Sequence, residues 1–159
     1  IEHGIYLDDE AIQMMLDAGT YLVPTLSAPL GLLEAGDRGV DIPEVILDKA
    51  RAVVDVHRDS IRQAIDAGVK IAMGTDSGVS PHGQNLRELG LMADLGMSPT
   101  AVLESTTRIA AELMGVDADL GTLEVGKIAD AVVFSGTDLD VSDMRPRLAN
   151  VFQGGNRVA

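Results

Sequence analysis

The sequence predicts an α/β fold in which parallel strands alternate with helices, followed by a small β module. Two short apolar runs, at residues 21–26 and 69–75, each follow a helical pattern that closes on a glycine. A third strand is expected at residues 1–3, where the chain begins. Beyond residue 117 the pattern changes to short β segments separated by glycine turns. We therefore expect residues 1–116 to hold the parallel strands and residues 117–159 to hold the β module.

Local signals bound the first helices. Asp8 can cap a helix whose first turn is acidic, and Gly19 can end it. Residues 27–41, which follow the second strand, are rich in glycine, proline and serine, and we predict a functional loop there. The longest helix is expected from Pro43 to Gly68, because apolar residues recur between them at helical spacing.

Two further helices and the β module complete the chain. A short helix is expected around residues 86–92, and Ser98-Pro99 should open another that runs to Met114. Short β segments are expected at residues 120–126, 129–134, 150–152 and 157–158. The methionines at helical spacing are predicted to lie in the core: Met14, Met15, Met92 and Met114.

Composition limits the classes of function. With 25 acidic and 12 basic residues among 159, the net charge of −13 disfavours nucleic acid and anionic membranes as partners and favours a small-molecule substrate. No apolar run approaches the ~20 residues of a membrane span, and the N-terminus has no export signal, so the cytoplasm is the expected location. Since cysteine is absent, a metal would need histidine and carboxylate ligands. The chain starts inside an expected strand without methionine, which predicts a fragment of a longer protein.

The best candidates for chemistry are Asp76 and His3. Asp76 lies where an apolar strand opens into the glycine-flanked loop 74–78, and His3 ends the first strand just before Gly4. Barrel enzymes keep catalytic groups at such strand ends. A divalent metal lowers the pKa of bound water towards ~7, and a neighbouring carboxylate can bind the metal and accept the proton of the water. The two residues together suggest a metal-dependent hydrolase.

Other polar residues have two interpretations. His82 should overhang the same mouth as Asp76, where it would contact substrate or carry a proton, or it is an ordinary loop histidine. Thr25 and Ser77 are candidates for substrate binding, although hydroxyls at strand ends more often satisfy backbone groups. His57 falls on the apolar face of the long helix and is predicted to be packed in the core. Lys127 is predicted to be a surface or turn residue.

The chain resembles the metal-dependent amidohydrolase superfamily, in particular its prolidase and imidazolonepropionase-like branch. Four segments carry the resemblance: IEHG at 1–4, GTDSG at 74–78, PHGQNLRELGLMADLGMSP at 81–99 and GTLEVGKIADAVVF at 121–134. It implies the C-terminal part of a (β/α)8 TIM-like barrel, with strands six to eight in residues 1–116, followed by part of a small β-sandwich domain. It also implies that His3 is the metal ligand of the sixth strand and that Asp76 is both ligand and general base on the eighth.

Several metal ligands of that family have no counterpart here. The His-x-His pair of the first strand, the lysine of the fourth and the histidine of the fifth cannot be placed among these residues. We expect one or two divalent ions, zinc first, in the parent enzyme, and an incomplete site in this chain.

The resemblance implies hydrolysis of C–N bonds by metal-activated water in small substrates such as Xaa-Pro dipeptides or N-acyl amino acids. An imidazolonepropionase-type opening of a cyclic amide is the enzymatic alternative, and an inactive, self-associating fragment or pseudoenzyme is the other. A second copy of the chain or a missing N-terminal half is the expected partner, because three strands leave unpaired edges.

Overall fold

Three parallel strand segments lie side by side in the first part of the chain. The computed structural model describes residues 1–159, and it pairs β1 (Tyr21–Leu22) with β2 (Lys70–Ile71). Glu2 forms a parallel bridge to Val23, so the segment at residues 1–3 flanks β1 on its other side. The expected parallel α/β arrangement is confirmed, with shorter strands than predicted. Three segments are fewer than the eight of a (β/α)8 barrel, so the barrel stays a prediction.

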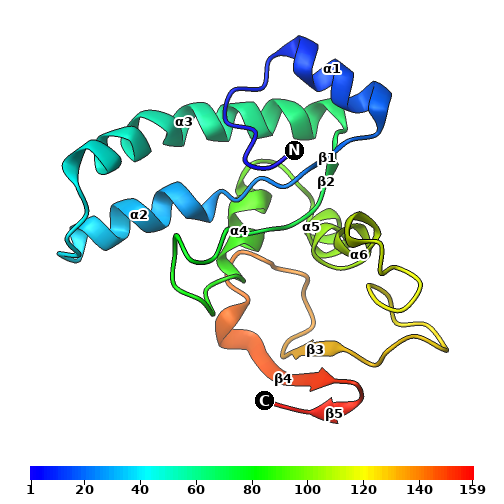
Figure 1. Cartoon of the computed structure of the whole chain (residues 1–159). Coiled ribbons are helices and arrows are strands. Elements are labelled where there is room, and N and C mark those ends of the chain that lie inside the picture. Colours follow the sequence, from blue (N-terminus) through cyan, green and yellow to red (C-terminus); the bar gives the residue numbers. More distant parts are fainter.

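Helices α1 (Asp9–Ala18) and α3 (Glu44–Ala67) begin and end at the predicted signals. The side chain of Asp8 accepts a 2.8 Å hydrogen bond from the N–H of Ala11, which caps α1. The two helices end at Gly19 and Gly68, whose φ angles of 63° and 86° lie in the left-handed region that glycine enters at little cost. Figure 1 shows both helices on the same side of the strands.

The prediction of a loop at residues 27–41 is wrong, because residues Ser27–Asp37 form helix α2. No side chain within the segment caps it. Glu88, some sixty residues away, instead accepts the N–H of Ser27, the first residue of α2, and that of the preceding Leu26. The start of this helix therefore depends on a tertiary contact. Gly36 allows α2 to approach α3, because a Cβ at this position would lie 2.9 Å from a methyl group of Leu47. The glycine that favoured a loop is thus a packing residue.

Helix α4 (Arg87–Asp94) is confirmed, but the helix expected from Ser98 to Met114 is broken at Thr107 into α5 (Pro99–Thr106) and α6 (Arg108–Met114). Hydroxyl groups explain part of the break, since Thr107 donates to the carbonyl of Leu103 at 2.7 Å. In addition, the carbonyl of Ser105 accepts the N–H of Met73 at 3.0 Å and is diverted from the helix.

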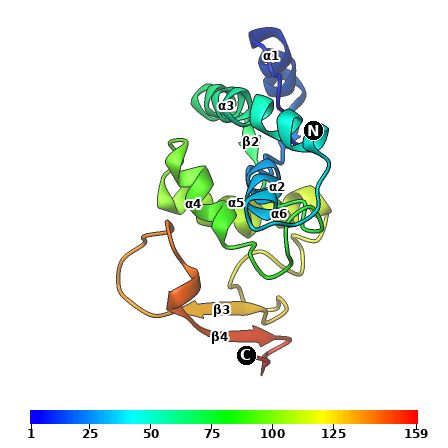
Figure 2. The same ribbon diagram turned by 90° about the vertical axis from the view of Figure 1, so that its left-hand side faces the viewer.

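The second part of the chain forms one antiparallel sheet. Its strands are β3 (Ala131–Phe134), β4 (Leu148–Gln153) and β5 (Asn156–Arg157), in the order β3-β4-β5, and the 3-10 turn η1 (Arg145–Arg147) precedes β4. The closing hairpin is confirmed. The strand expected at 120–126 is wrong: the Lys127 amine bonds to Leu120 and Thr122 and closes these residues into turns. Figures 1 and 2 show the sheet at the opposite end of the molecule from α1.

One apolar core joins most of these elements. Met15 and Met92 are buried in it as predicted, whereas Met14 and Met114 are 65% and 68% exposed, so the prediction is wrong for those two. Both lie on the outward faces of their helices. The fully buried members of this core include Leu22, Ile61, Leu89, Met92, Leu95, Val102 and Val141.

No helix has both the length and the apolar character of a membrane span.

Candidate functional site

Backbone strain marks the end of each parallel strand segment. His3, Thr25 and Asp76 are the non-glycine residues with positive φ, at 64°, 51° and 50°. Each follows its strand segment, so the three residues gather at the carboxyl edge of the sheet. Such backbone costs about 1–3 kcal/mol per residue, and a β-branched threonine tolerates it poorly. Strain at three neighbouring strand ends indicates a functional site and includes both predicted metal ligands.

The side chains of His3 and Thr25 contact each other. Nδ1 of His3 lies 2.6 Å from Oγ1 of Thr25, whose side chain is buried, while the imidazole is half-buried. Nε2 has no hydrogen-bond partner in the structure. A metal-binding histidine typically uses one ring nitrogen for the ion and the other for an orienting hydrogen bond. The arrangement therefore fits a ligand that binds through Nε2.

His57 holds the same strand end from the opposite side. Its imidazole is 2% exposed, as the sequence predicted for a core residue, and Nε2 donates to the carbonyl of His3 at 2.8 Å. Burial lowers the pKa of His57 below its ordinary value, and it outweighs the hydrogen bonds to the backbone of His3 and Pro24, which act in the opposite direction. Burial thus disfavours the charged form of the imidazole of His57.

Asp76 is presented on a tight loop after β2. Its carboxylate is exposed and carries no hydrogen bond, while its carbonyl accepts the N–H of Val79 at 3.2 Å. The loop begins at Gly74, where a Cβ would collide with a methyl group of Val23. Glycine here lets the loop leave the strand beside β1. The free carboxylate can bind a cation or accept a proton.

The same loop carries Ser77 and His82. The hydroxyl of Ser77 lies 2.8 Å from that of Thr75, and the imidazole of His82 is exposed without a partner. The carbonyl of Gly83 accepts a 2.8 Å hydrogen bond from Arg145, which ties the loop to the β module. Neither Ser77 nor His82 bonds to His3 or Asp76, so their roles in substrate binding stay predictions.

The donor set fits part of a metal site. His3 and Asp76 follow strand segments that flank β1 on its two sides. Residues 1–159 contain no group of three or more histidine, cysteine or acidic side chains that could hold an ion. A catalytic zinc commonly has three protein ligands and one water. These two side chains can thus supply part of the coordination, and the chain supplies no third candidate beside them.

Sequence reasoning missed Glu88. This side chain is fully buried on α4, and its two carboxylate oxygens accept the N–H groups of Leu26 at 2.7 Å and Ser27 at 2.8 Å. Burial raises the pKa of Glu88, against the lowering effect of these hydrogen bonds. The signal in the sequence is its place four residues before Met92, on the apolar face of a helix.

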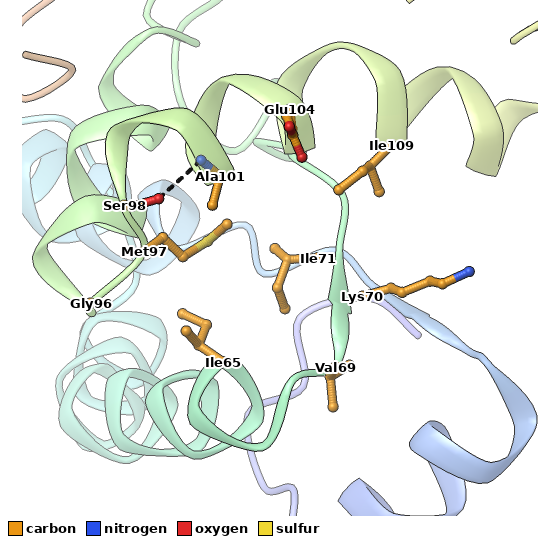
Figure 3. Close-up of a pocket in the computed structure, with 10 residues that line it drawn as sticks. All are labelled: Ile65, Val69, Lys70, Ile71, Gly96, Met97, Ser98, Ala101, Glu104 and Ile109. Carbon is orange, nitrogen blue, oxygen red and sulfur yellow. Dashed lines mark hydrogen bonds between the residues drawn. The ribbon is translucent and has the colours of Figure 1, made fainter. Parts of the chain in front are cut away.

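Two cavities lie away from these strand ends. Figure 3 shows one of about 310 Å³ beside β2 at the start of the strand, where Ile65, Ile71 and Met97 form apolar walls. A larger one, of about 1180 Å³, lies between α6 and the β3-β4-β5 sheet, and its lining is mostly apolar. None of the candidate residues at the strand ends lines either cavity.

Comparisons with known proteins agree on one family. The model of the amidohydrolase family matches residues 1–158. Ochratoxinase of Aspergillus niger is 30% identical over 160 residues, which cover 98% of this chain and 32% of the relative. Imidazolonepropionase of Bdellovibrio bacteriovorus is 33% identical over 141 residues, covering 81% of this chain and 33% of the relative.

A solved structure of a Xaa-Pro dipeptidase with methionine bound in its active site is also similar. It superposes with a TM-score of 0.88 at 37% sequence identity, and the match covers 99% of this chain and 39% of the dipeptidase. The chain thus spans about a third of the length of these curated relatives.

Proposed function

This chain belongs to the amidohydrolase family, and on that premise we propose that it contributes part of the active site of a metal-dependent hydrolase that cleaves C–N bonds in small substrates. One observation carries the proposal: His3 and Asp76 lie at the carboxyl edge of the parallel strands on strained backbone, with Nδ1 of His3 engaged by Thr25. Strain held at such an edge favours a catalytic purpose over a purely structural one.

The proposed chemistry divides between the two residues. His3 would hold a divalent ion through Nε2, and Asp76 would stand beside it as ligand and general base. When bound, the ion supplies a water of lowered pKa. Asp76 would accept a proton from the attacking water and return it to the amine that leaves, so one carboxylate serves both proton transfers. The remaining ligands of the ion would come from outside residues 1–159.

The substrate class we propose is a Xaa-Pro dipeptide or an N-acyl amino acid. Its support is the similarity to the Xaa-Pro dipeptidase, which extends over 99% of this chain. A second candidate is the opening of a cyclic amide, favoured by the imidazolonepropionase that is 33% identical. Both reactions break a C–N bond with water, so the same two residues would serve either. A third candidate, an inactive module that associates with itself, follows from the incomplete ligand set.

The experiment compares residues 1–159 with the longest polypeptide whose sequence contains them. Both are purified, supplied with zinc or manganese, and assayed against Xaa-Pro dipeptides, N-acyl amino acids and imidazolonepropionate. We expect metal-dependent turnover of Xaa-Pro dipeptides by the longer polypeptide and none by residues 1–159 alone. Hydrolysis of the cyclic amide alone would favour the second candidate. Failure of every substrate with a folded, metal-loaded protein would contradict the proposed function and leave the inactive module.

A further inference from the structure

Glu88 is a buried carboxylate without a part in the proposed hydrolysis. It lies in the first turn of α4, and each of its oxygens accepts one backbone N–H, from Leu26 and from Ser27. A buried carboxylate is costly unless its oxygens are hydrogen-bonded, so this pair of adjacent N–H groups fixes its position. The two N–H groups belong to the residues that immediately follow Thr25.

Thr25 links this carboxylate to His3. Its backbone has a φ of 51°, which a β-branched residue adopts only when its surroundings hold it there. Leu26 precedes the first turn of α2 without a side-chain cap of its own, so Glu88 supplies the acceptor that fixes the next two peptide groups. The held backbone directs Oγ1 of Thr25 to a point 2.6 Å from Nδ1 of His3.

We propose that Glu88 is a positioning residue that orients the imidazole of His3 through Thr25. In this arrangement the N–H at Nδ1 donates to Oγ1 of Thr25, and Nε2 keeps the lone pair that a metal ion requires. The inference rests on the proposed function for the ion that Nε2 would bind. The tautomer of His3 is a property of the chain itself and can be measured without an ion.

The rival explanation is that Glu88 only fastens α4 to α2. The structure contains a matched control for it, because Arg87 and Glu34 join the same two helices by hydrogen bonds of 2.8 and 2.6 Å. Neither Arg87 nor Glu34 forms a hydrogen bond with Thr25 or His3. Glu34→Gln therefore loosens the same helix pair and leaves the path to His3 intact.

The experiment records imidazole nitrogen spectra of the ¹⁵N-labelled polypeptide that carries this chain, with His57→Gln and His82→Gln used to assign His3. In the unsubstituted protein and in Glu34→Gln, we expect His3 to be in the tautomer that is protonated at Nδ1. Glu88→Gln should shift His3 towards a mixture of tautomers, because one carboxamide group cannot accept both backbone N–H groups. Thr25→Val, which lacks the hydroxyl, should shift it too.

The second measurement is the affinity of the same polypeptide for zinc without substrate, determined by competition with a chelator. Loss of an orienting partner typically lowers metal affinity by about 10–100-fold. We expect such a loss for Glu88→Gln and for Thr25→Val, and no further loss when the two are combined, because they act along one path. Thr25→Ser, which keeps the hydroxyl, should retain the parent's tautomer and affinity.

Two outcomes would overturn the inference: an unchanged His3 spectrum in Glu88→Gln, or an equal shift in Glu34→Gln. If Glu88→Gln does not fold, Thr25→Val and Thr25→Ser test the inference in its place. An unchanged tautomer of His3 in Thr25→Val would then contradict the proposed path through Thr25. A parent protein without turnover or zinc binding would instead contradict the proposed function, and the tautomer measurement would still test the role of Glu88.

Discussion

The imidazole of His57 donates a 2.8 Å hydrogen bond from Nε2 to the carbonyl oxygen of His3. The two histidines are 54 residues apart and belong to different elements, since His57 lies in α3 and His3 follows the first strand segment. A helix of 24 residues thereby holds the backbone of a candidate metal ligand. The backbone of His3 is fixed from α3 and its ring is held by Thr25.

Replacement of His57 should show what this contact contributes. His57→Phe fills the space but leaves the carbonyl of His3 without its donor, and we expect a loss of about 1–3 kcal/mol in the free energy of unfolding. His57→Gln keeps an N–H donor and should lose less. Urea denaturation followed by circular dichroism measures both variants. Equal losses would show that packing, and not the hydrogen bond, is what His57 provides.

Glu88 should give the stability a pH dependence of a defined sign. Its pKa is raised by burial, so the folded chain binds a proton more readily than the unfolded chain does. Its contribution is present below the ordinary glutamate pKa of about 4.3 and is lost as the pH rises through the raised value. Relative to Glu88→Gln, the parent should therefore become less stable across that window. Denaturation of both proteins from pH 4 to pH 8 tests this, and parallel curves would contradict it.

Asp76→Asn should separate catalysis from folding. The amide keeps the shape of the side chain but cannot accept a proton, so we expect turnover in the longest polypeptide to fall by about 10²–10⁴-fold. Thermal unfolding should be unchanged, because the carboxylate is exposed and unbonded. Asp117→Asn, at another exposed aspartate, is the control. Retention of more than about a tenth of the parent kcat would exclude Asp76 as the general base.

Gly74→Ala should destabilise the chain by steric conflict with Val23. The added methyl group meets a side chain already packed beside β1, and overpacking of this kind typically costs about 1–3 kcal/mol. Val23→Ala removes the obstructing methyl group, so the double variant should recover part of the loss. A double-mutant cycle measures the coupling, which should exceed about 0.5 kcal/mol. Additive losses would show that the conflict relaxes elsewhere.

The chain alone should associate in solution. Several apolar side chains are largely exposed, among them Leu123 at 86%, Leu139 at 60% and Met114 at 68%. Unpaired strand edges and exposed apolar surface favour self-association or capture of a complementary segment. Light scattering after size exclusion should give masses above 16.7 kDa that rise with concentration. A single 16.7 kDa species at high concentration would contradict the prediction.

Local signals predicted what depends on local physics. Asp8, Gly19 and Gly68 bound two helices correctly, because capping and left-handed backbone are properties of a few neighbouring residues. The helix at Ser27–Asp37 could not be predicted in this way, since its cap comes from Glu88 in another element. Likewise, the break at Thr107 depends partly on a hydrogen bond from the strand segment that follows α3.

The same distinction between local signals and tertiary contacts applies to the candidate site. His3 and Asp76 could be proposed from strand ends, glycines and family resemblance, and the structure finds both on strained backbone. The contact of His3 with Thr25 could not, because it joins residues 22 positions apart through two side-chain orientations. Glu88 was missed because an acidic residue in a helix is usually exposed, and only packing reveals that this one is buried.

The contact between α4 and the β module limits how this protein could be recombined. Gly90 lies against the backbone of Ser142, where a Cβ would come within 2.6 Å of the carbonyl oxygen, and Val141 belongs to the apolar core. Arg145 further binds the loop of the candidate site. A chimera joined at residue 116 would therefore combine α4 of one protein with a β module whose surface fits the corresponding helix of another protein. When segments are exchanged between related proteins, α4 and the β3-β4-β5 sheet would have to be transferred together.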